Sequence, residues 1–189
     1  MDRDTDSPVS RNGSSFDDEF SEYFAARVHA LRNTAHLLCG DWHRAEDITQ
    51  LAMLRLYVAW PRLARRDALD AYARRVVVRT FLAENRRSRW RREQLTDAPP
   101  DIATTAPHQD SAERLLLTRA LTVVPPKQRA VLVLRYWNDL SVEEVAATLR
   151  CSVGTVKSQA ARGLATLRQR LGPHYAELST ITEGGDPHG

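Results

Sequence analysis

Apolar residues near the start of the chain recur at steps of three and four positions, with mostly polar residues between them. This spacing predicts a helix that buries one face, because residues three or four apart lie on the same side of an α-helix. The repeating positions are Phe16, Phe20, Phe24, Val28, Leu31, Ala35 and Leu38.

Two further helices are predicted before residue 92. Gly40 is a suitable helix end, and Asp41 is a suitable N-cap for a second helix that we expect to end before Pro61. A third helix is expected from about Asp67 toward Arg92. No segment alternates apolar and polar residues as a half-buried strand does, so the expected fold class is all-α.

The second predicted helix is apolar on more than one side. A helix at the edge of a core needs only a single apolar stripe. The wider apolar surface fits a helix that also meets a partner, and it fits equally well the central helix of a small bundle. Its apolar residues are Ile48, Leu51, Ala52, Met53, Leu54, Leu56, Tyr57, Val58 and Trp60.

The third predicted helix is strongly basic from residue 72 to residue 92. This stretch holds eight arginines and one acid, Glu84, and the aromatic residues Tyr72, Phe81 and Trp90 lie among the arginines. A cationic track neutralises phosphates and releases counterions, while aromatic faces stack on exposed bases. Duplex or opened DNA is therefore a candidate ligand. The alternative is a solvated amphipathic helix with its aromatics in the core, although acids usually balance the charge on such a face.

A helix-turn-helix is predicted near the end of the chain. Ser141 and Glu144 have the spacing of a capping box at the start of a short helix. A turn at Arg150 and Cys151 follows, and Ser152 is a suitable cap for a second helix. A structural helical hairpin is the alternative, but the segment from Arg150 onward carries basic residues and no acids as far as residue 172.

The second helix of this pair has an apolar side and a side of small and polar residues. Small residues let a helix backbone approach the floor of the DNA major groove, where hydroxyl and cationic side chains contact bases and phosphates. The candidate DNA contacts are Thr155, Lys157, Ser158 and Arg162.

Composition and charge divide the chain into five parts. Residues 1–15 are polar and predict a disordered leader, and residues 173–189 predict a flexible tail. Residues 93–113 contain five acids, three prolines and neither Lys nor Arg, which is typical of a linker. Two helical domains, 16–92 and 114–172, are expected on either side of this flexible linker.

Several classes of protein are disfavoured. Cys39 and Cys151 lie far apart and neither has a CxxC partner, which argues against a disulfide framework or a cysteine zinc site. The chain lacks the apolar core of a signal peptide and any stretch long enough to span a membrane, so we expect a cytoplasmic protein without membrane insertion. No phosphate loop, nucleophile elbow or HExxH motif occurs, and neither an enzymatic activity nor a cofactor is expected.

Three segments resemble, in the same order, the extracytoplasmic-function (ECF) sigma factors, the smallest members of the main bacterial sigma family. The polymerase-binding segment of that family resembles GDWHRAEDITQLAMLRLYVAWPRL, and its −10 promoter segment resembles AYARRVVVRTFLAENRRSRWRR. Its C-terminal domain resembles VPPKQRAVLVLRYWNDLSVEEVAATLRCSVGTVKSQAARGLATLR. The resemblance covers about residues 16–172 and is nearest to actinobacterial members.

The resemblance implies an RNA polymerase sigma factor, which binds core polymerase and promoter DNA and directs initiation by −35 recognition and −10 melting. An anti-sigma factor is a further candidate partner. Core-polymerase binding is implied for Asp47, Ile48, Thr49 and Gln50. Contacts to −10 DNA are implied for Tyr72, Arg74, Arg75, Arg79, Thr80, Phe81, Arg86 and Arg87. Contacts to −35 DNA are implied for Lys127, Arg129, Arg135, Thr155, Lys157, Ser158 and Arg162, the first three mostly to phosphates.

Three positions depart from the family pattern. Leu51 stands where many members have glutamate, which removes one polar contact to the polymerase. Arg79 stands where many have asparagine, which favours a phosphate or stacking contact over base recognition. Arg150 replaces the glycine expected at the turn, where a positive φ strains other residues.

Parts of the sequence also fit two other functions. A DNA-binding regulator would use residues 16–92 as a sensor or dimerisation domain, for which the basic track has no purpose. A metal enzyme would use His29, His36 and His43, which recur every seven residues, but the expected helix break at Gly40 separates them.

Overall fold

The structure is a computed structural model that describes residues 11–63, 69–94 and 112–171. These residues are helical apart from short turns, and none of them lies in a strand. The all-α expectation is confirmed. The elements are α1 (Arg11–Cys39), α2 (Trp42–Ala59), the 3-10 turn η1 (Trp60–Arg62), α3 (Leu69–Gln94), α4 (Ala112–Thr122), α5 (Pro126–Leu132), the π-helical turn η3 (Val133–Trp137), α6 (Val142–Leu149) and α7 (Val153–Leu171).

The turn between α1 and α2 forms as its residues predict. Gly40 has a φ of +77°, a region that favours glycine, and its N–H donates to the carbonyl of His36 at 2.7 Å. The Asp41 carboxylate accepts the N–H of Arg44 at 2.8 Å, which satisfies one of the unpaired donors at the start of α2. At its other end, α1 begins at Arg11, so residues 11–15 are helical rather than part of a disordered leader.

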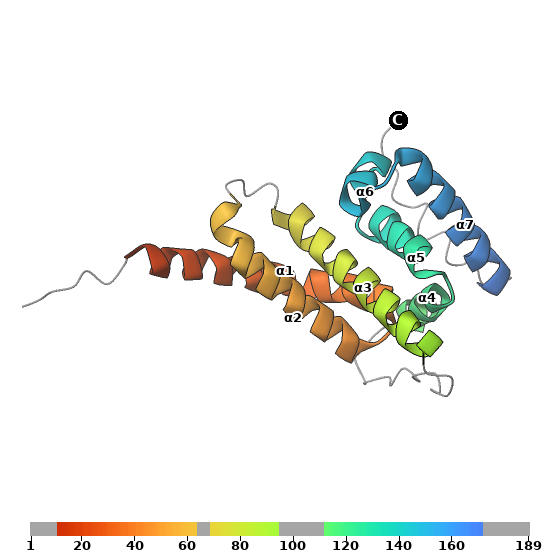
Figure 1. Ribbon diagram of the computed structural model, residues 1–189, viewed down its shortest axis with the longest axis horizontal. Helices are drawn as coiled ribbons and strands as arrows, with labels where there is room; N and C mark the ends of the chain where they lie inside the picture. Colours follow the sequence, from red (N-terminus) through yellow and green to blue (C-terminus); the bar gives the residue numbers. More distant parts are fainter. Residues whose placement is uncertain (1–10, 64–68, 95–111, 172–189) are drawn as a thin grey trace, which may run out of the picture.

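Helix α3 packs against α1 and α2 to complete the first block (Figure 1). Asp70 in its first turn accepts a hydrogen bond from the Tyr23 hydroxyl at 3.0 Å and pairs with Arg27 at 3.0 Å. Further along, Arg55 of α2 donates to the hydroxyl of Thr80 at 2.8 Å. These contacts fix which face of α3 looks toward the core.

The second block, α4–α7, contains the predicted helix-turn-helix. The Ser141 hydroxyl accepts the N–H of Glu144 at 3.1 Å, and the Glu144 carboxylate accepts the N–H of Ser141 at 2.7 Å, so the capping box at the start of α6 is confirmed. The hydroxyl of Ser152 accepts the N–H of Thr155 at 3.1 Å and caps α7. Gly163 on the buried side of α7 lets this helix approach α5, because an added Cβ would lie 2.9 Å from a methyl carbon of Leu132.

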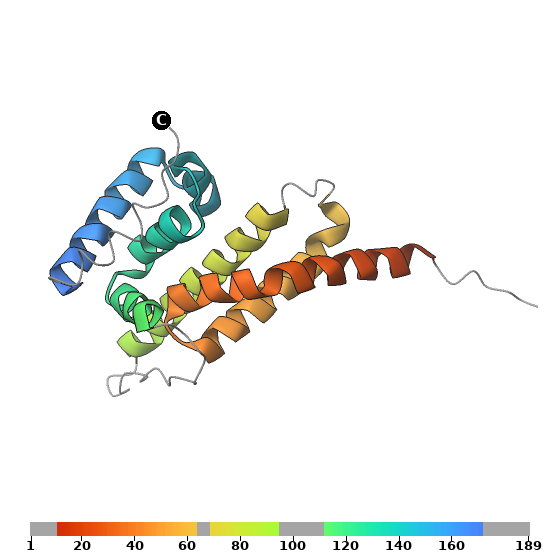
Figure 2. The same cartoon turned by 180° about the vertical axis from the view of Figure 1, so that it is seen from behind.

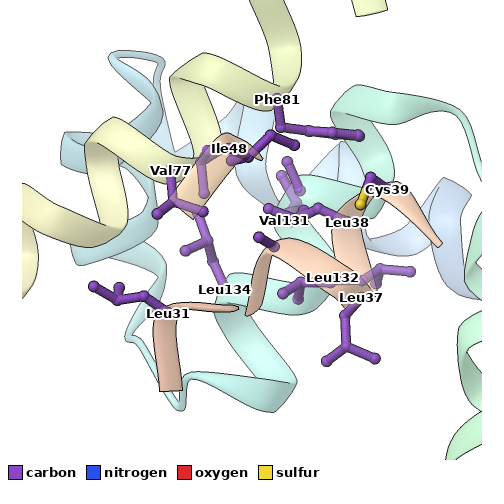
Figure 3. Packing of buried hydrophobic residues seen from close by; sticks show 14 of the residues in the cluster. Leu31, Leu37, Leu38, Cys39, Ile48, Val77, Phe81, Val131, Leu132 and Leu134 are labelled. Carbon is purple, nitrogen blue, oxygen red and sulfur yellow. The ribbon is translucent and has the colours of Figure 1, made fainter. Parts of the chain in front are cut away.

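The two blocks share one hydrophobic core. Its buried residues come from the end of α1 and from all the other α-helices of both blocks, together with η3, and Figure 3 shows part of this cluster. Figures 1 and 2 show the second block at one end of the three-helix bundle, beside α3 and the end of α1. The labelled members of the cluster are Leu31, Leu37, Leu38, Cys39, Ile48, Val77, Phe81, Val131, Leu132 and Leu134.

The sequence therefore did not predict how closely the two helical blocks associate. Most of the expected linker, residues 95–111, lies outside the described residues, as do residues 1–10 and most of the expected tail. Among the helices that are described, none is long and apolar enough to cross a membrane.

Candidate nucleic-acid and partner surfaces

Three arginine side chains in the second half of α3 are exposed to solvent. Arg86, Arg87 and Arg89 are exposed, and the neighbouring Trp90 is 66% exposed. An exposed indole beside several guanidinium groups can stack on an unpaired base while the cations neutralise phosphates. This arrangement suits a nucleic-acid ligand better than a protein core, because a core would cover the indole.

The first half of α3 lies partly beneath the second block. Arg74, Arg75 and Arg79 are partly buried, and the side-chain Nε atoms of Arg74 and Arg75 are buried without a hydrogen-bond partner among the described residues. The pKa of Arg79 is lowered by desolvation and then by the positive charges of Arg150 and Arg75. Tyr72 is also only partly exposed.

Two of the residues expected at −10 DNA lie in the core instead. Phe81 is 1% exposed, and Thr80 is 2% exposed with its hydroxyl accepting a hydrogen bond from Arg55. Both side chains therefore face away from any ligand on the surface of α3. They hold the helix in its place in the core. Trp90, which the family resemblance did not assign to the −10 contacts, is the exposed aromatic residue of α3.

Helix α7 exposes the residues expected to meet DNA. Thr155, Lys157, Ser158 and Arg162 are all exposed, whereas Val156 is buried on the opposite side. The Ser158 hydroxyl donates to the carbonyl of Thr155 at 3.0 Å. Thr155, Ser158 and Arg162 lie on one exposed side of this capped helix, and Lys157 is exposed at the flank of that side. An exposed helix face of this kind can enter a major groove.

The turn before α7 carries the strain that its sequence implies. Arg150 has φ 53° and ψ 55°, a left-handed conformation in which a Cβ is unfavourable. Its N–H donates to the carbonyl of Ala146, and the N–H of Cys151 also donates to that carbonyl at 3.0 Å. These two hydrogen bonds cap the C-terminal end of α6. A glycine at position 150 could make the same bonds without backbone strain.

Arg129 does not fit the expected phosphate contact. Its side chain is buried, and burial lowers its pKa to about 10, so it remains protonated at neutral pH. The guanidinium donates to the carbonyls of Leu38 at 2.6 Å, Thr122 at 2.6 Å and Val124 at 3.0 Å, and it lies 5.7 Å from the ring centre of Phe81. With these partners, the group is a structural cation that DNA cannot reach in this conformation.

The other two expected phosphate contacts differ in exposure. Lys127 is exposed at the start of α5, where the N-terminal end of the helix dipole also favours an anion. Arg135 is partly buried, and one of its guanidinium nitrogens donates to the carbonyl of Leu140. Lys127 is therefore accessible to a phosphate. In Arg135, one guanidinium nitrogen is already used in a hydrogen bond within the protein.

On α2, the expected polymerase-binding residues divide between surface and core. Asp47 and Gln50 are exposed, whereas Ile48 is fully buried and the Thr49 hydroxyl donates to the carbonyl of Ala45 at 2.7 Å. Ile48 and Thr49 therefore hold the helix in place and are not available to a partner.

Two apolar residues that were not assigned to the site continue the exposed face of α2. Leu54 is 60% exposed and Val58 is 68% exposed. With Asp47 and Gln50 they follow steps of three and four residues, so they form one stripe along the helix. The excess of apolar residues in this helix was the signal that could have identified them.

The histidines do not converge. The His36 ring is buried and stacks on Trp42, with ring centres 3.7 Å apart, whereas His29 and His43 are exposed. No group of three His, Cys, Asp or Glu side chains within the described ranges is placed to hold a metal ion.

Comparisons with known proteins match two segments of this chain to known protein families. Residues 23–91 match the family model for Sigma-70 region 2, and residues 114–167 match the model for Sigma-70, region 4. An RNA polymerase sigma-E factor of Streptomyces avermitilis is 41% identical over 157 residues, which cover 81% of this chain and 85% of the relative. The ECF RNA polymerase sigma factor SigE of Mycolicibacterium smegmatis is 33% identical, over 86% of this chain and 64% of the relative.

Among solved structures, the chain is similar to the sigma factor RpoE of Bartonella quintana, crystallised in complex with the anti-sigma factor NepR. The TM-score is 0.70 and the sequence identity 22%, over 81% of this chain and 96% of that one. This likeness supports the fold.

Proposed function

The chain belongs to the ECF sigma factors of the sigma-70 family, and on that premise we propose how its residues divide the work of promoter recognition. It is an RNA polymerase sigma factor, a regulatory subunit that binds core polymerase and directs promoter-specific initiation. In our proposal, the domain of residues 16–92 binds polymerase and the −10 element, and the domain of residues 114–172 recognises the −35 element.

Core polymerase binds, in this proposal, to the exposed stripe of α2 formed by Asp47, Gln50, Leu54 and Val58. The polar residues Asp47 and Gln50 form hydrogen bonds to the partner, and the apolar residues Leu54 and Val58 supply apolar surface that is buried on binding. Exposed large apolar side chains in a stripe are typical of a partner surface. Leu54 and Val58 are 60% and 68% exposed, so covering them contributes about 1–2 kcal/mol for each side chain.

The exposed face of α7 recognises the −35 element. Thr155, Ser158 and Arg162 contact base edges in the major groove, while Lys157 and Lys127 hold phosphates and fix the register. Ser152 and Glu144 take part through the caps that orient the two helices of the motif.

The basic face of α3 captures the opened −10 element. Unpairing and flipping a base costs a few kcal/mol, and stacking on an aromatic side chain returns about 1–3 kcal/mol per base. Arg86, Arg87 and Trp90 are placed for this task, and Arg74, Arg75 and Arg79 extend the track toward the start of the helix. Opening is therefore favoured only where captured bases and phosphates together offset the lost pairing.

The observation that carries these assignments is the exposure of three separate surfaces, on α2, α3 and α7, in the order in which regions 2 and 4 match the chain. The test is transcription by core polymerase with three variants of the full chain, each analysed at three steps. We expect Gln50→Ala with Leu54→Ala to weaken polymerase binding, Arg162→Ala to weaken −35 binding, and Arg86→Ala with Trp90→Ala to reduce permanganate-detected strand opening.

The matched control is Glu22→Ala, which changes an exposed residue of α1 outside the three surfaces. If all variants lose the same step, or if the control loses as much as they do, the division of roles is wrong. A stand-alone DNA-binding regulator would differ at the outset, because it would not bind core polymerase or set its start site.

An anti-sigma factor is proposed as a further partner. The support is that a solved protein of the same fold was crystallised with one. Competition between such a protein and core polymerase for this chain, measured by fluorescence anisotropy, would test this partner separately from promoter recognition.

A further inference from the structure

Glu84 is the one acid in the basic stretch from residue 72 to residue 92. The arginines and the indole of Trp90 only donate hydrogen bonds, whereas an ionised carboxylate only accepts them. Hydroxyl and amide side chains of the stretch, such as those of Ser88 and Asn85, can both donate and accept. Glu84 is therefore the side chain of this stretch that a bound base can satisfy only with a donor.

The carboxylate of Glu84 lies where α3 runs beside α2 (Figures 1 and 2). The side chain is 34% exposed, and one of its oxygens is 3.9 Å from a guanidinium nitrogen of Arg44 on α2. This separation is too long for a hydrogen bond, so the ion pair leaves acceptor positions of the carboxylate for a ligand. The charged groups of Arg87 on α3 and of Arg55 on α2 are also near enough to influence its pKa.

Partial burial makes Glu84 a more discriminating acceptor than an acid in open water. Desolvation is the main reason that its pKa is raised, and the charge of Asp47 raises it further, whereas the nearby arginines lower it. Hydrogen bonds to a carboxylate are strong in a partly dry site, and an acceptor placed against it is repelled more strongly there. A donor and an acceptor on a base are therefore sharply distinguished at this position.

The bases of an opened strand differ in the group that they would present to this carboxylate. Cytosine and adenine carry an exocyclic amine, at N4 and N6, whereas thymine and guanine carry an oxygen, O4 or O6, at the corresponding position. The amine donates to a carboxylate, and the oxygen is repelled by it. Arg87 is exposed three residues further along α3, where it can hold the phosphate of the same nucleotide.

We propose that Glu84 reads one base of the opened −10 element and selects an amino base, cytosine or adenine, over a keto base, thymine or guanine. The proposal rests on the proposed function of α3 and names the residue that gives this helix a preference among bases. Stacking on Trp90 and phosphate contacts to arginines are available to every nucleotide. Glu84 contacts an edge that only half of the bases can satisfy.

The test uses holoenzyme assembled from the full chain and core polymerase. Fluorescence anisotropy measures its binding to fork-junction DNA with a single-stranded −10 element, in which each position is changed in turn to all four bases. At one position we expect the wild type to prefer cytosine to thymine, or adenine to guanine, by at least about five-fold. Glu84→Gln should lose this preference at that position alone, because its amide donates as well as accepts.

A second measurement leaves the protein unchanged. The preferred cytosine or adenine is replaced by an analogue of the same ring system that lacks the exocyclic amine. Wild-type holoenzyme should bind this DNA at least about three-fold more weakly, because the carboxylate loses its donor. Glu84→Gln holoenzyme should lose less, because a neutral amide makes a weaker hydrogen bond to the amine.

The matched control is Arg44→Gln, which removes the ion-pair partner and leaves the carboxylate in place. It should keep the base preference of the wild type. If Glu84 matters only as the partner of Arg44, both variants will lose the preference, and direct reading of a base is wrong. An equal gain in affinity for all four bases in Glu84→Gln would also overturn the proposal, because it would mean that the acid only offsets nearby cations.

The outcomes separate this proposal from the function on which it rests. A wild-type holoenzyme without a base preference at any −10 position would overturn the assignment of α3 to the −10 element. A preference that is the same in the wild type and in Glu84→Gln would overturn the role of Glu84 and leave that assignment standing.

Discussion

Gly40 offers a direct energetic test of the contact between the two blocks. Its φ of +77° disfavours any residue with a Cβ, and a Cβ added there would lie 2.4 Å from the Cγ2 methyl of Thr122 in the second block. Gly40→Ala therefore adds two separate penalties. One is local to the turn between α1 and α2, and the other exists only while the blocks are in contact.

The two penalties differ in their energetic cost and in the structural change that relieves them. The left-handed backbone costs an alanine about 1–2 kcal/mol. The clash is relieved if Thr122 turns away, but its hydroxyl then loses the 2.7 Å hydrogen bond to the carbonyl of Arg119, which costs about 1 kcal/mol. We expect Gly40→Ala to lower the free energy of unfolding by about 2–3 kcal/mol in total.

Thr122→Ser removes the clashing methyl and keeps the hydroxyl, so alone it should be nearly neutral. Combined with Gly40→Ala it should recover about 1 kcal/mol, which exceeds the usual non-additivity of about 0.3–0.5 kcal/mol for independent sites. Urea unfolding of the four proteins, followed by circular dichroism, gives this coupling directly. Purely additive effects would refute the reasoning, because they would mean that residues 40 and 122 do not meet in the folded chain.

Three further predictions concern single residues. Arg162→Ala should weaken binding to −35 duplex by about 1–3 kcal/mol if the arginine contacts a base, and an equal loss on all sequences in fluorescence anisotropy would mean a phosphate contact instead. Arg150→Gly should raise the free energy of unfolding by about 1 kcal/mol in urea titrations, because it relieves a left-handed backbone, and a loss of stability would contradict that explanation. Leu54→Asp should weaken core-polymerase binding at least ten-fold without lowering the melting temperature. Ile48→Asp, at a fully buried position, should instead unfold the protein. A large loss of stability in Leu54→Asp would show that Leu54 is a core residue.

Features determined by neighbouring residues in the sequence were predictable. The capping box of Ser141 and Glu144, the N-cap at Asp41 and the positive φ at Arg150 each follow from the chemistry of a few adjacent positions, and each is present. The same holds for α7, where helical spacing separates the exposed Arg162 from the buried Val156.

Features determined by tertiary packing were not predictable in this way. Arg129 has the charge of a phosphate contact, but its acceptors include the carbonyl of Leu38, which lies 91 positions away in the sequence. Thr80 and Phe81 lie in a strongly basic segment, and only the packing of α3 against α2 and α5 places them inside. Family resemblance identifies a segment, whereas burial decides which of its residues can touch a ligand.

In our proposal, this chain gives core RNA polymerase its choice of start site. The most direct measurement is transcription by purified core enzyme on a library of genomic fragments, with and without the full chain, followed by mapping of the RNA 5′ ends. We predict discrete start sites that require the chain and share spaced −35 and −10 sequences, and that weaken with Arg162→Ala. Start sites that are the same with and without the chain would contradict it.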